Sequence, residues 1–272
     1  MAGYRTMMGL LLTVGIVFQL SESRVTCRND EGNEVDWYIL YKLPLGHSDN
    51  GLSYLYMDES TDGWKLSKHT IDSSSGTLAN TLEPLLDYYV RKTEGFGYIL
   101  YNDQLEKKTV SSSYGHSKGV VMLDRATGVW LSHSTPKFPT DQSKSFWPES
   151  GNVNDLYSGL IVDDMEENLY VKGWGNKGRS VLLPSDCSTP HHHVYNVKKV
   201  KLLETVYNDT QDHSKWCVAP ISGWTCIADL NRHESQKYRG GGAICIKDVA
   251  VAKAFWTTIK TWWKKYSDLV PT

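Results

Sequence analysis

The chain is predicted to fold as a β-rich, mixed α/β protein, and three observations support this. Short runs of alternating apolar and polar residues recur along its length, separated by turn-forming Gly, Pro, Asn and Asp, a pattern typical of strands. Ten Trp and sixteen Tyr far outnumber five Phe, and rings that keep a polar atom favour a sheet-rich fold. Two segments carry apolar residues at helical spacing, which adds helices to the sheets.

The first 23 residues are expected to be a secretory signal and not part of the fold. Arg5 supplies a positive start, Met7 to Leu20 is an almost unbroken apolar run, and small residues precede a cleavage site after Ser23. The alternative is a buried N-terminal helix. No later segment is apolar for long enough to cross a bilayer. Residues 24–272 suffice for a single domain, with a first half at about 24–145 and a second at about 155–272.

The first half is predicted to pack one helix on short strands. Thr81–Lys92 has apolar residues at helical spacing, Thr81 can cap its start, and Pro84 then falls in the first turn. A tight turn at Asp124–Gly128 joins the last two strands into a hairpin. The predicted strands of this half are Val35–Leu43, Gly51–Met57, Trp64–Lys68, Gly97–Tyr101, Val120–Leu123 and Val129–Leu131.

The second half follows a stretch rich in Pro, Ser and Gly, Lys137–Asn154, which we call the seam. At the other end, Val249–Tyr266 places apolar residues on one face and Lys on the other. We expect this amphipathic helix to pack on the sheet and not to lie on a membrane surface. The predicted strands of this half are Tyr157–Val162, Leu169–Lys172, Ser180–Leu183 and Val194–Leu203.

The charge balance argues against a constitutively basic nucleic-acid binder, because the net charge is −2 at pH 7. Nine histidines change this in acid, since protonating all of them would carry the net charge to about +7. A polyanion would therefore be attracted at acidic pH much more than at neutral pH.

The five cysteines fit an oxidising compartment, and their odd number leaves one thiol over. The absence of a Cys-x-x-Cys pair disfavours a zinc ribbon or a redox motif. Asn208 heads a glycosylation sequon in a predicted surface loop. The run His191–His193 could bind a metal, but without other obvious ligands we favour an exposed loop and predict no metal site.

One polar triplet, His-Ser-Lys, occurs twice, at His116-Ser117-Lys118 and at His213-Ser214-Lys215. The first copy leads into a predicted strand. In extended conformation His116 and Lys118 then project to one side and Ser117 to the other. An imidazole beside a fixed cation suits a phosphate, although a lone His-x-Lys is most often a solvated surface pair.

Longer stretches around these triplets resemble the deoxyribonuclease II family. They are VDWYILYKLP, YNDQ at Tyr101–Gln104, GHSKGVVMLD, WLSHSTPKFP, DLYSG, DHSKWCVAP and RGGGAIC, in the expected order over nearly the whole mature chain. The resemblance implies a phospholipase D-like, pseudo-two-fold fold in which each half brings one His-x-Lys to a shared site. It also implies an acid endonuclease of lysosomes that acts on DNA without a divalent metal or other cofactor, leaving 3′-phosphate and 5′-hydroxyl ends.

The resemblance also implies roles for individual residues. His116 and His213 would share a phosphohistidine mechanism, and by analogy we take His116 as the nucleophile and His213 as the general acid. Lys118 and Lys215 would hold the non-bridging phosphate oxygens. The second-tier candidates are Asn231 and Ser134, each eighteen residues after a motif histidine, His133 as a supporting hydrogen-bonding group, and Arg232 and Arg239, which contact the DNA backbone or stabilise the fold.

The chain departs from the family in the seam. Only Thr140–Asn154 stands where the family normally carries several tens of residues, and the usual partner of Cys27 falls in that missing stretch. The usual partner of Cys187 is also absent. Cys226 and Cys245 have matching flanks and are expected to form a disulfide, whereas Cys27 and Cys187 would pair with each other only if the fold brought them close.

Two other function classes stay open beside the nuclease. The shortened chain could be a secreted, non-catalytic relative that binds DNA or partners. It could also be a phospholipase D-like lipid phosphodiesterase, which the Trp-rich C-terminal helix favours. The lipid family's longer His-Lys-Asp motif weighs against this, because Leu123 and Pro220 stand where its acidic residue belongs. Oligomeric state is not predicted.

Overall fold

The computed structural model describes residues 25–45, 51–103, 115–134, 155–175, 181–188 and 190–263. The predicted signal segment with its cleavage site lies outside these residues, and so does the whole seam. The described residues form several sheets and three α-helices, which confirms a β-rich, mixed α/β chain. None of the helices within these ranges is long and apolar enough to span a membrane.

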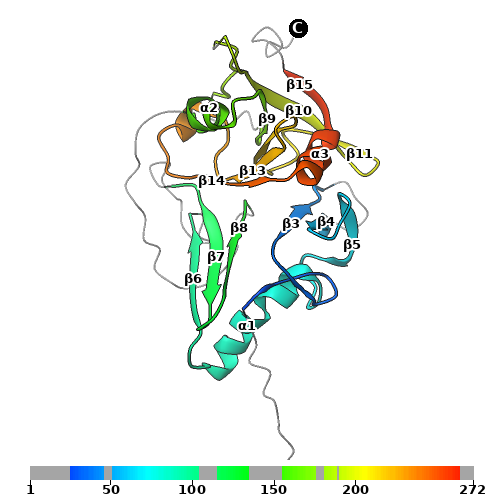
Figure 1. Ribbon diagram of the computed structural model, residues 1–272, viewed down its shortest axis with the longest axis vertical. Coiled ribbons are helices and arrows are strands. Elements are labelled where there is room, and N and C mark those ends of the chain that lie inside the picture. The colour runs from blue at the N-terminus through cyan, green and yellow to red at the C-terminus, as the bar shows by residue number, and fades with distance from the viewer. Residues whose placement is uncertain are drawn as a thin grey trace, which may run out of the picture.

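One seven-stranded sheet dominates the structure and occupies the upper part of Figure 1. Its strand order is β11-β10-β9-β12-β13-β14, with β15 paired to β10, and β9 and β10 form its parallel pair. The strands are β9 (Leu169–Lys172), β10 (Val194–Leu202), β11 (Thr205–Asn208), β12 (Trp216–Ala219), β13 (Trp224–Ala228), β14 (Ala243–Lys247) and β15 (Ile259–Trp263).

The residues before the seam form smaller sheets, which lie below the large one in Figure 1. The sheet β3-β4-β5 consists of β3 (Tyr38–Lys42), β4 (Ser53–Asp58) and β5 (Lys65–Thr70). The sheet β6-β7-β8 consists of β6 (Gly97–Asn102), β7 (Lys118–Leu123) and β8 (Gly128–Ser132), and is antiparallel throughout. A short pair, β1 (Cys27–Arg28) and β2 (Glu34–Val35), accompanies the helix α1.

Helix α1 begins four residues earlier than the sequence predicts, at Thr77, and ends at Arg91. The carboxylate of Asp30 accepts hydrogen bonds from both the amide and the hydroxyl of Thr77, at 3.0 and 2.7 Å, so a distant side chain caps the helix. Thr81 is buried inside the helix, where its hydroxyl accepts from the amide of Arg28. Pro84 therefore lies in the helix interior and not in its first turn.

The expected strand Tyr157–Val162 is wrong, because these residues form a π-helical turn at Tyr157–Ile161 that continues into α2 (Val162–Met165). The carboxylate of Asp155 accepts from the amide of Tyr157 and from the hydroxyl of Ser158, which starts a helical turn. The helical spacing places Tyr157 and Ile161 together in a buried cluster. Ser180 of the expected strand Ser180–Leu183 lies outside the described residues, and the described part holds one isolated bridge, Leu182 with His233.

The expected helix Val249–Tyr266 divides into two elements over residues 249–263, the part that the structure describes. Asp248 caps α3 (Val249–Thr258) by accepting from the amides of Ala250 and Val251, and the chain then extends as β15. Two threonines followed by Ile259, Trp262 and Trp263 are better strand formers than helix formers. Pairing of β15 with β10 satisfies backbone groups that a longer helix would leave exposed at the sheet.

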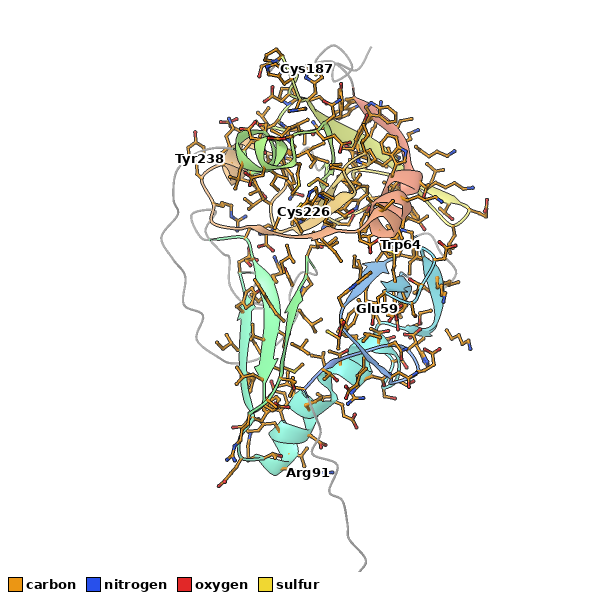
Figure 2. All side chains as sticks on the ribbon, in the orientation of Figure 1. Glu59, Trp64, Arg91, Cys187, Cys226 and Tyr238 are labelled. Carbon is orange, nitrogen blue, oxygen red and sulfur yellow. A yellow bond between two sulfur atoms is a disulfide. The ribbon has the colours of Figure 1, made fainter. Side chains whose placement is uncertain are left out.

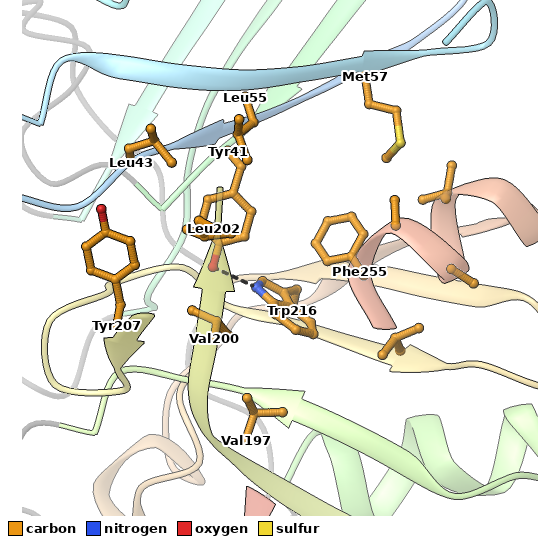
Figure 3. Close-up of a cluster of buried hydrophobic side chains, with 14 residues drawn as sticks. Tyr41, Leu43, Leu55, Met57, Val197, Val200, Leu202, Tyr207, Trp216 and Phe255 are labelled. Atoms are coloured by element: carbon orange, nitrogen blue, oxygen red, sulfur yellow. Dashed lines mark hydrogen bonds between the residues drawn. The ribbon is translucent and has the colours of Figure 1, made fainter. Parts of the chain in front are cut away.

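The largest core cluster joins the sheet β3-β4-β5 to the large sheet and α3 (Figure 3). Tyr41 on β3 packs among Trp64 and Phe255, and the indole N–H of Trp216 on β12 donates to its hydroxyl at 3.3 Å. Trp64, labelled in Figure 2, lies against α3 and donates to the carbonyl of Ala254. Each buried aromatic ring contributes about 1.5–3 kcal/mol, so this interface holds the two parts together.

Candidate active site

The first His-Ser-Lys lies at the start of β7, and its strand pairing places a carboxylate beside it. Asn102 on β6 faces Lys118 on β7, so Asp103 comes next to His116. Asp103 Oδ2 lies 2.7 Å from His116 Nδ1, and Asp103 Oδ1 lies 2.5 Å from Lys118 Nζ. His116 is 8% exposed and Lys118 is 2% exposed. Both side chains therefore lie on one face, as predicted from the alternation along the strand.

Burial and neighbouring charges set the protonation states of Asp103 and His116. Burial alone would raise the pKa of Asp103, but hydrogen bonds and charges from His116 and Lys118 outweigh it and lower the pKa to about 2. Burial, aided by the charges of Lys118 and Lys215, lowers the pKa of His116 to about 4 although Asp103 opposes the shift. Above about pH 4 the ionised Asp103 can only accept, so neutral His116 carries its proton on Nδ1. Its Nε2 lone pair is then available.

The loop before β14 fastens this motif to the large sheet. Arg239 Nη2 lies 2.9 Å from Asp103 Oδ2 and donates to the carbonyl of Gly115, while the amide of His116 donates to the carbonyl of Gly240 at 2.7 Å. The glycines from Gly240 thus bring backbone close to backbone. Gly119 is also required, because a Cβ there would lie 2.3 Å from the hydroxyl oxygen of Tyr101.

The second His-Ser-Lys precedes β12 and has a different carboxylate arrangement. Asp212 accepts hydrogen bonds from the hydroxyls of Tyr41 and Ser214, at 2.5 and 2.9 Å, and forms an ion pair with the buried Lys172 at 3.5 Å. The ammonium of Lys172 also donates to the carbonyl of Asp212 at 2.8 Å. Asp212 therefore orients the motif backbone and links it to the core around Tyr41.

His213 itself is exposed, and its ring stacks on the indole of Trp174 with centroids 3.9 Å apart and planes 28° apart. The amide of Trp174 donates to Asn231 Oδ1 at 2.8 Å, and its indole N–H donates to the carbonyl of Thr210 at 3.0 Å. Partial burial, with the charge of Lys215, lowers the pKa of His213, against the effect of Asp212.

The two motifs act on each other through their lysines. Burial, together with the charges of Lys118 and Lys172, lowers the pKa of Lys215 to about 7. Asp229 accepts a hydrogen bond from the amide of Gly242 at 3.2 Å and interacts electrostatically with both Lys118 and Lys215. Burial raises the pKa of Asp229 to about 6, because it outweighs the hydrogen bonds and the lysine charges. Two cations, two imidazoles and one titrating carboxyl therefore share one region.

The predicted supporting residues have different fates. His133 is half-buried beyond β8, its amide donates to the carbonyl of Lys118 at 3.1 Å, and burial with the Lys118 charge lowers its pKa to about 4. Asn231 is linked to the second motif through Trp174, whose amide donates to its Oδ1. Ser134 is half-buried two residues past β8, and the described contacts do not connect it to either motif.

The two arginines considered for contact with the DNA backbone both bind groups within the fold. Arg232 is 4% exposed and binds Asp155 at 2.7 Å, the carbonyl of Pro184 and the amide oxygen of Asn196. Its guanidinium is thus committed inside the fold, which corrects its assignment to the substrate. Arg239 is bound to Asp103 and Gly115 and so positions the first motif.

The remaining expectations concern the periphery. Cys226 and Cys245 face each other across β13 and β14 and form a disulfide. Cys27 and Cys187 do not form a disulfide with each other. Asn208 is exposed at the end of β11. His191 is exposed, and no three His, Cys, Asp or Glu side chains of the described ranges gather as a metal site.

Five residues of the site were not predicted from the sequence as site residues. Two of them had a local signal, since Asp103 comes two residues after a predicted strand and Asp212 directly precedes a motif histidine. The others depend on register between distant strands, for which the sequence offers no local pattern. They are Asp103, Lys172, Trp174, Asp212 and Asp229.

Comparison with known proteins gives one consistent family. A family model for deoxyribonuclease II matches residues 26–155 and 149–265, two segments that meet in the seam. The chain is 31% identical to deoxyribonuclease-2-alpha of Sus scrofa, over 88% of this chain and 90% of the relative. It is 28% identical to deoxyribonuclease-2-beta of Homo sapiens, over 90% and 93%. It is also 28% identical to plancitoxin-1 of Acanthaster planci, over 93% and 96%. The first alignment spans 334 positions, more than the 272 residues of the chain, so the relative has positions that this chain lacks.

Proposed function

The chain belongs to the deoxyribonuclease II family, and we propose that it is an acid endodeoxyribonuclease that uses two histidines and no metal ion. The observation that carries this proposal is the contrast between the two copies of His-Ser-Lys. His116 is buried, neutral and fixed by Asp103, whereas His213 is exposed on Trp174. A two-step phosphoryl transfer needs one neutral nucleophile and one proton donor, and these environments supply both.

In the first step, Nε2 of His116 attacks phosphorus and the bond from phosphorus to the 5′-oxygen breaks. Protonated His213 gives its proton to that oxygen, so a 5′-hydroxyl leaves and a 3′-phosphohistidine forms. Asp103 accepts from Nδ1–H throughout and stabilises the positive charge that develops on the His116 ring. Lys118 and Lys215 stabilise the equatorial oxygens.

In the second step, water attacks the phosphohistidine. Neutral His213 takes a proton from the water, the phosphorus–nitrogen bond breaks, and a 3′-phosphate leaves while His116 returns to its neutral form. His213 is then charged again for the next cycle. The products are one 3′-phosphate and one 5′-hydroxyl end per cut.

Acid dependence follows from the groups around the phosphate. Lowering the pH through about 7 charges Lys215, and lowering it through about 6 neutralises Asp229, so both changes make the site more attractive to a phosphodiester. Further acidification toward about pH 4 protonates His116 and removes the nucleophile. Activity should therefore be highest between about 4 and 6, a range that suits DNA degradation in lysosomes after entry through the secretory route.

The proposal includes the phospholipase D-like arrangement expected for the family. Its support is that β7 and β12, one on each side of the seam, bring their motifs into electrostatic contact. The lipid phosphodiesterase loses its main support, because Trp256 and Trp262 pack on Tyr170 with centroids 4.6 and 5.2 Å away. The competing non-catalytic role is favoured only by the positions that this chain lacks, which are expected from the family resemblance to fall in the seam.

Supercoiled plasmid separates the enzyme from the non-catalytic relative. The mature chain is incubated at about pH 5 in chelator beside His116→Ala and His213→Ala. We expect nicking by the parent, with ends that polynucleotide kinase phosphorylates directly and that prime a polymerase only after phosphatase treatment. No nicking by the parent would refute the nuclease, and nicking by both variants at the parent's rate would refute the assigned site.

A further inference from the structure

We propose that Trp174 is a positioning residue for His213, whose imidazole it holds by ring stacking, and that Asn231 acts through it. The role rests on the proposed function, since it matters for catalysis only if His213 is the proton donor. The stacking itself is a property of the fold and can be measured without DNA.

The contacts of Trp174 show why it can define one orientation of an exposed ring. His213 is exposed, so few neighbouring groups restrict its side-chain torsions. The indole of Trp174 stacks on the imidazole of His213 with ring centroids 3.9 Å apart. Two hydrogen bonds hold Trp174 itself: its backbone amide donates to Asn231 Oδ1, and its indole N–H donates to the carbonyl of Thr210. A rigid platform below a mobile imidazole selects the rotamers that lie flat on it.

The position of Trp174 in the chain links it to both sides of the motif. It follows β9, whose last residue is the buried Lys172, and His233 Nε2 lies 3.0 Å from its carbonyl oxygen. The next residue, Gly175, packs so closely on Asp209 that a Cβ would lie 2.4 Å from its carboxyl carbon. The stretch from Lys172 to Gly175 is therefore fixed against the segment that carries His213.

Charge gives the stack a second role. Burial is the largest cause that lowers the pKa of His213, and charged groups act on the imidazole as well. Three cations disfavour its protonated form and one carboxylate favours it; they are Lys215, Lys172, Lys42 and Asp212. His233 and Asp209 are the titratable groups packed on the Trp174 segment. The face of an indole attracts a cation, so the stack stabilises the imidazolium against these three lysines. Without it, His213 would hold its proton only at lower pH.

The spacing of Asn231 from His213 led us to expect direct support of the site. Instead, its side-chain oxygen accepts from Trp174, and its own amide donates to Gln236 Oε1 at 2.7 Å. Asn231 thus acts on His213 indirectly, by fixing Trp174. Loss of its side chain should weaken the stack without removing the indole.

The test compares Trp174→Leu, Trp174→Phe and Asn231→Ala with Trp224→Leu, a matched control on β13, where the half-buried indole packs near Lys247 far from the motif end of β12. The histidine Cε1–H signals are followed by NMR between about pH 4 and 8, with His213→Ala assigning the His213 signal. In the parent, ring current should shift this signal upfield. In Trp174→Leu we expect loss of that shift and a titration midpoint lower by about half a unit to one unit.

Plasmid cleavage provides the functional readout. Its alkaline limb, to which Lys215 and Asp229 also contribute, should move to lower pH in Trp174→Leu, less in Asn231→Ala, and least in Trp174→Phe, which keeps an aromatic face. An unchanged or higher titration midpoint of His213 in Trp174→Leu would overturn the inference even if the variant were less stable. If the parent showed the upfield shift but no cleavage, the stack would stand and only the proposed nuclease would fail.

Discussion

Two copies of the same triplet sit in opposite environments, and the difference shows that neighbours, not motif letters, assign chemical roles. At the first copy, Asp103 binds the imidazole of His116 directly at 2.7 Å. At the second, the carboxylate next to His213 turns away to Tyr41, Ser214 and Lys172. One histidine is therefore buried and held as a neutral base, while the other is exposed and stacked on an indole.

The largest loss of cleavage should come from removing the carboxylate that binds His116, which the second motif lacks. In Asp103→Asn, His116 loses the acceptor that holds its proton on Nδ1, and Lys118 and Arg239 lose their shared ion-pair partner. We expect cleavage to fall by about 10²–10⁴-fold, as for other carboxylates that orient a catalytic histidine. Plasmid nicking per folded molecule measures this, with folding checked by thermal unfolding.

A matched control is Asp124→Asn, which removes a carboxylate from the β7–β8 turn that accepts from Val25 and Thr127. It should reduce stability and leave cleavage per folded molecule near the parent value. Cleavage by Asp103→Asn within threefold of the parent would contradict the role of Asp103.

A stability measurement tests the buried charge of Lys215 in the second motif. Lys215 is 5% exposed and its pKa is lowered to about 7, so its charge opposes folding at acidic pH. Between about pH 7 and 10 the unfolded chain binds more protons at Lys215 than the folded chain does. The destabilisation caused by burying the charged Lys215 therefore decreases as the pH rises. Lys215→Met should raise the free energy of unfolding by about 2–4 kcal/mol at pH 5, and by much less at pH 10, while activity is lost.

Denaturant unfolding at both pH values tests this, with Lys201→Met as a control because Lys201 pairs with the exposed Glu204. A loss of stability in Lys215→Met at pH 5 would mean that its charge is better compensated than its surroundings indicate.

The smallest effect concerns the carboxyl that lies near both motifs. Asp229 has a pKa raised to about 6 by burial, so near pH 7 it is mostly ionised and offsets the charges of Lys118 and Lys215. Asp229→Asn imitates the acid form at every pH. Its cleavage at pH 7, relative to pH 5, should exceed that of the parent by about threefold to tenfold. A pH–rate profile identical to the parent's would rule out this contribution.

Local patterns predicted the elements around the site better than the contacts within it. The alternation along β7 correctly placed His116 and Lys118 on one face, and β9 matches its predicted bounds. The Cys226–Cys245 disulfide, expected from the resemblance, is also formed. By contrast, the role of Asp30 as a helix cap for Thr77 depends on residues 47 positions apart, which no local pattern reveals.

The same limit explains the errors at the site. Trp174 reaches His213 because β9 lies beside β12 in the large sheet, an order set by tertiary packing. Arg232 was one of two arginines considered for DNA because its charge was visible and its buried partner Asp155 was not. Segments near sheet edges also escaped prediction, since β15 follows α3 only because β10 is there to pair with it.

The central claim is that His116 attacks phosphorus and His213 protonates the leaving oxygen. Thymidine 3′-(4-nitrophenyl phosphate) tests it, because nitrophenolate takes the place of the 5′-oxygen and leaves without a proton. In a single turnover at about pH 5, His213→Ala should release nitrophenolate within roughly tenfold of the parent rate, whereas His116→Ala should be slower by about 10³-fold or more. Fast release by His116→Ala, with slow release by His213→Ala, would contradict this assignment and exchange the two roles.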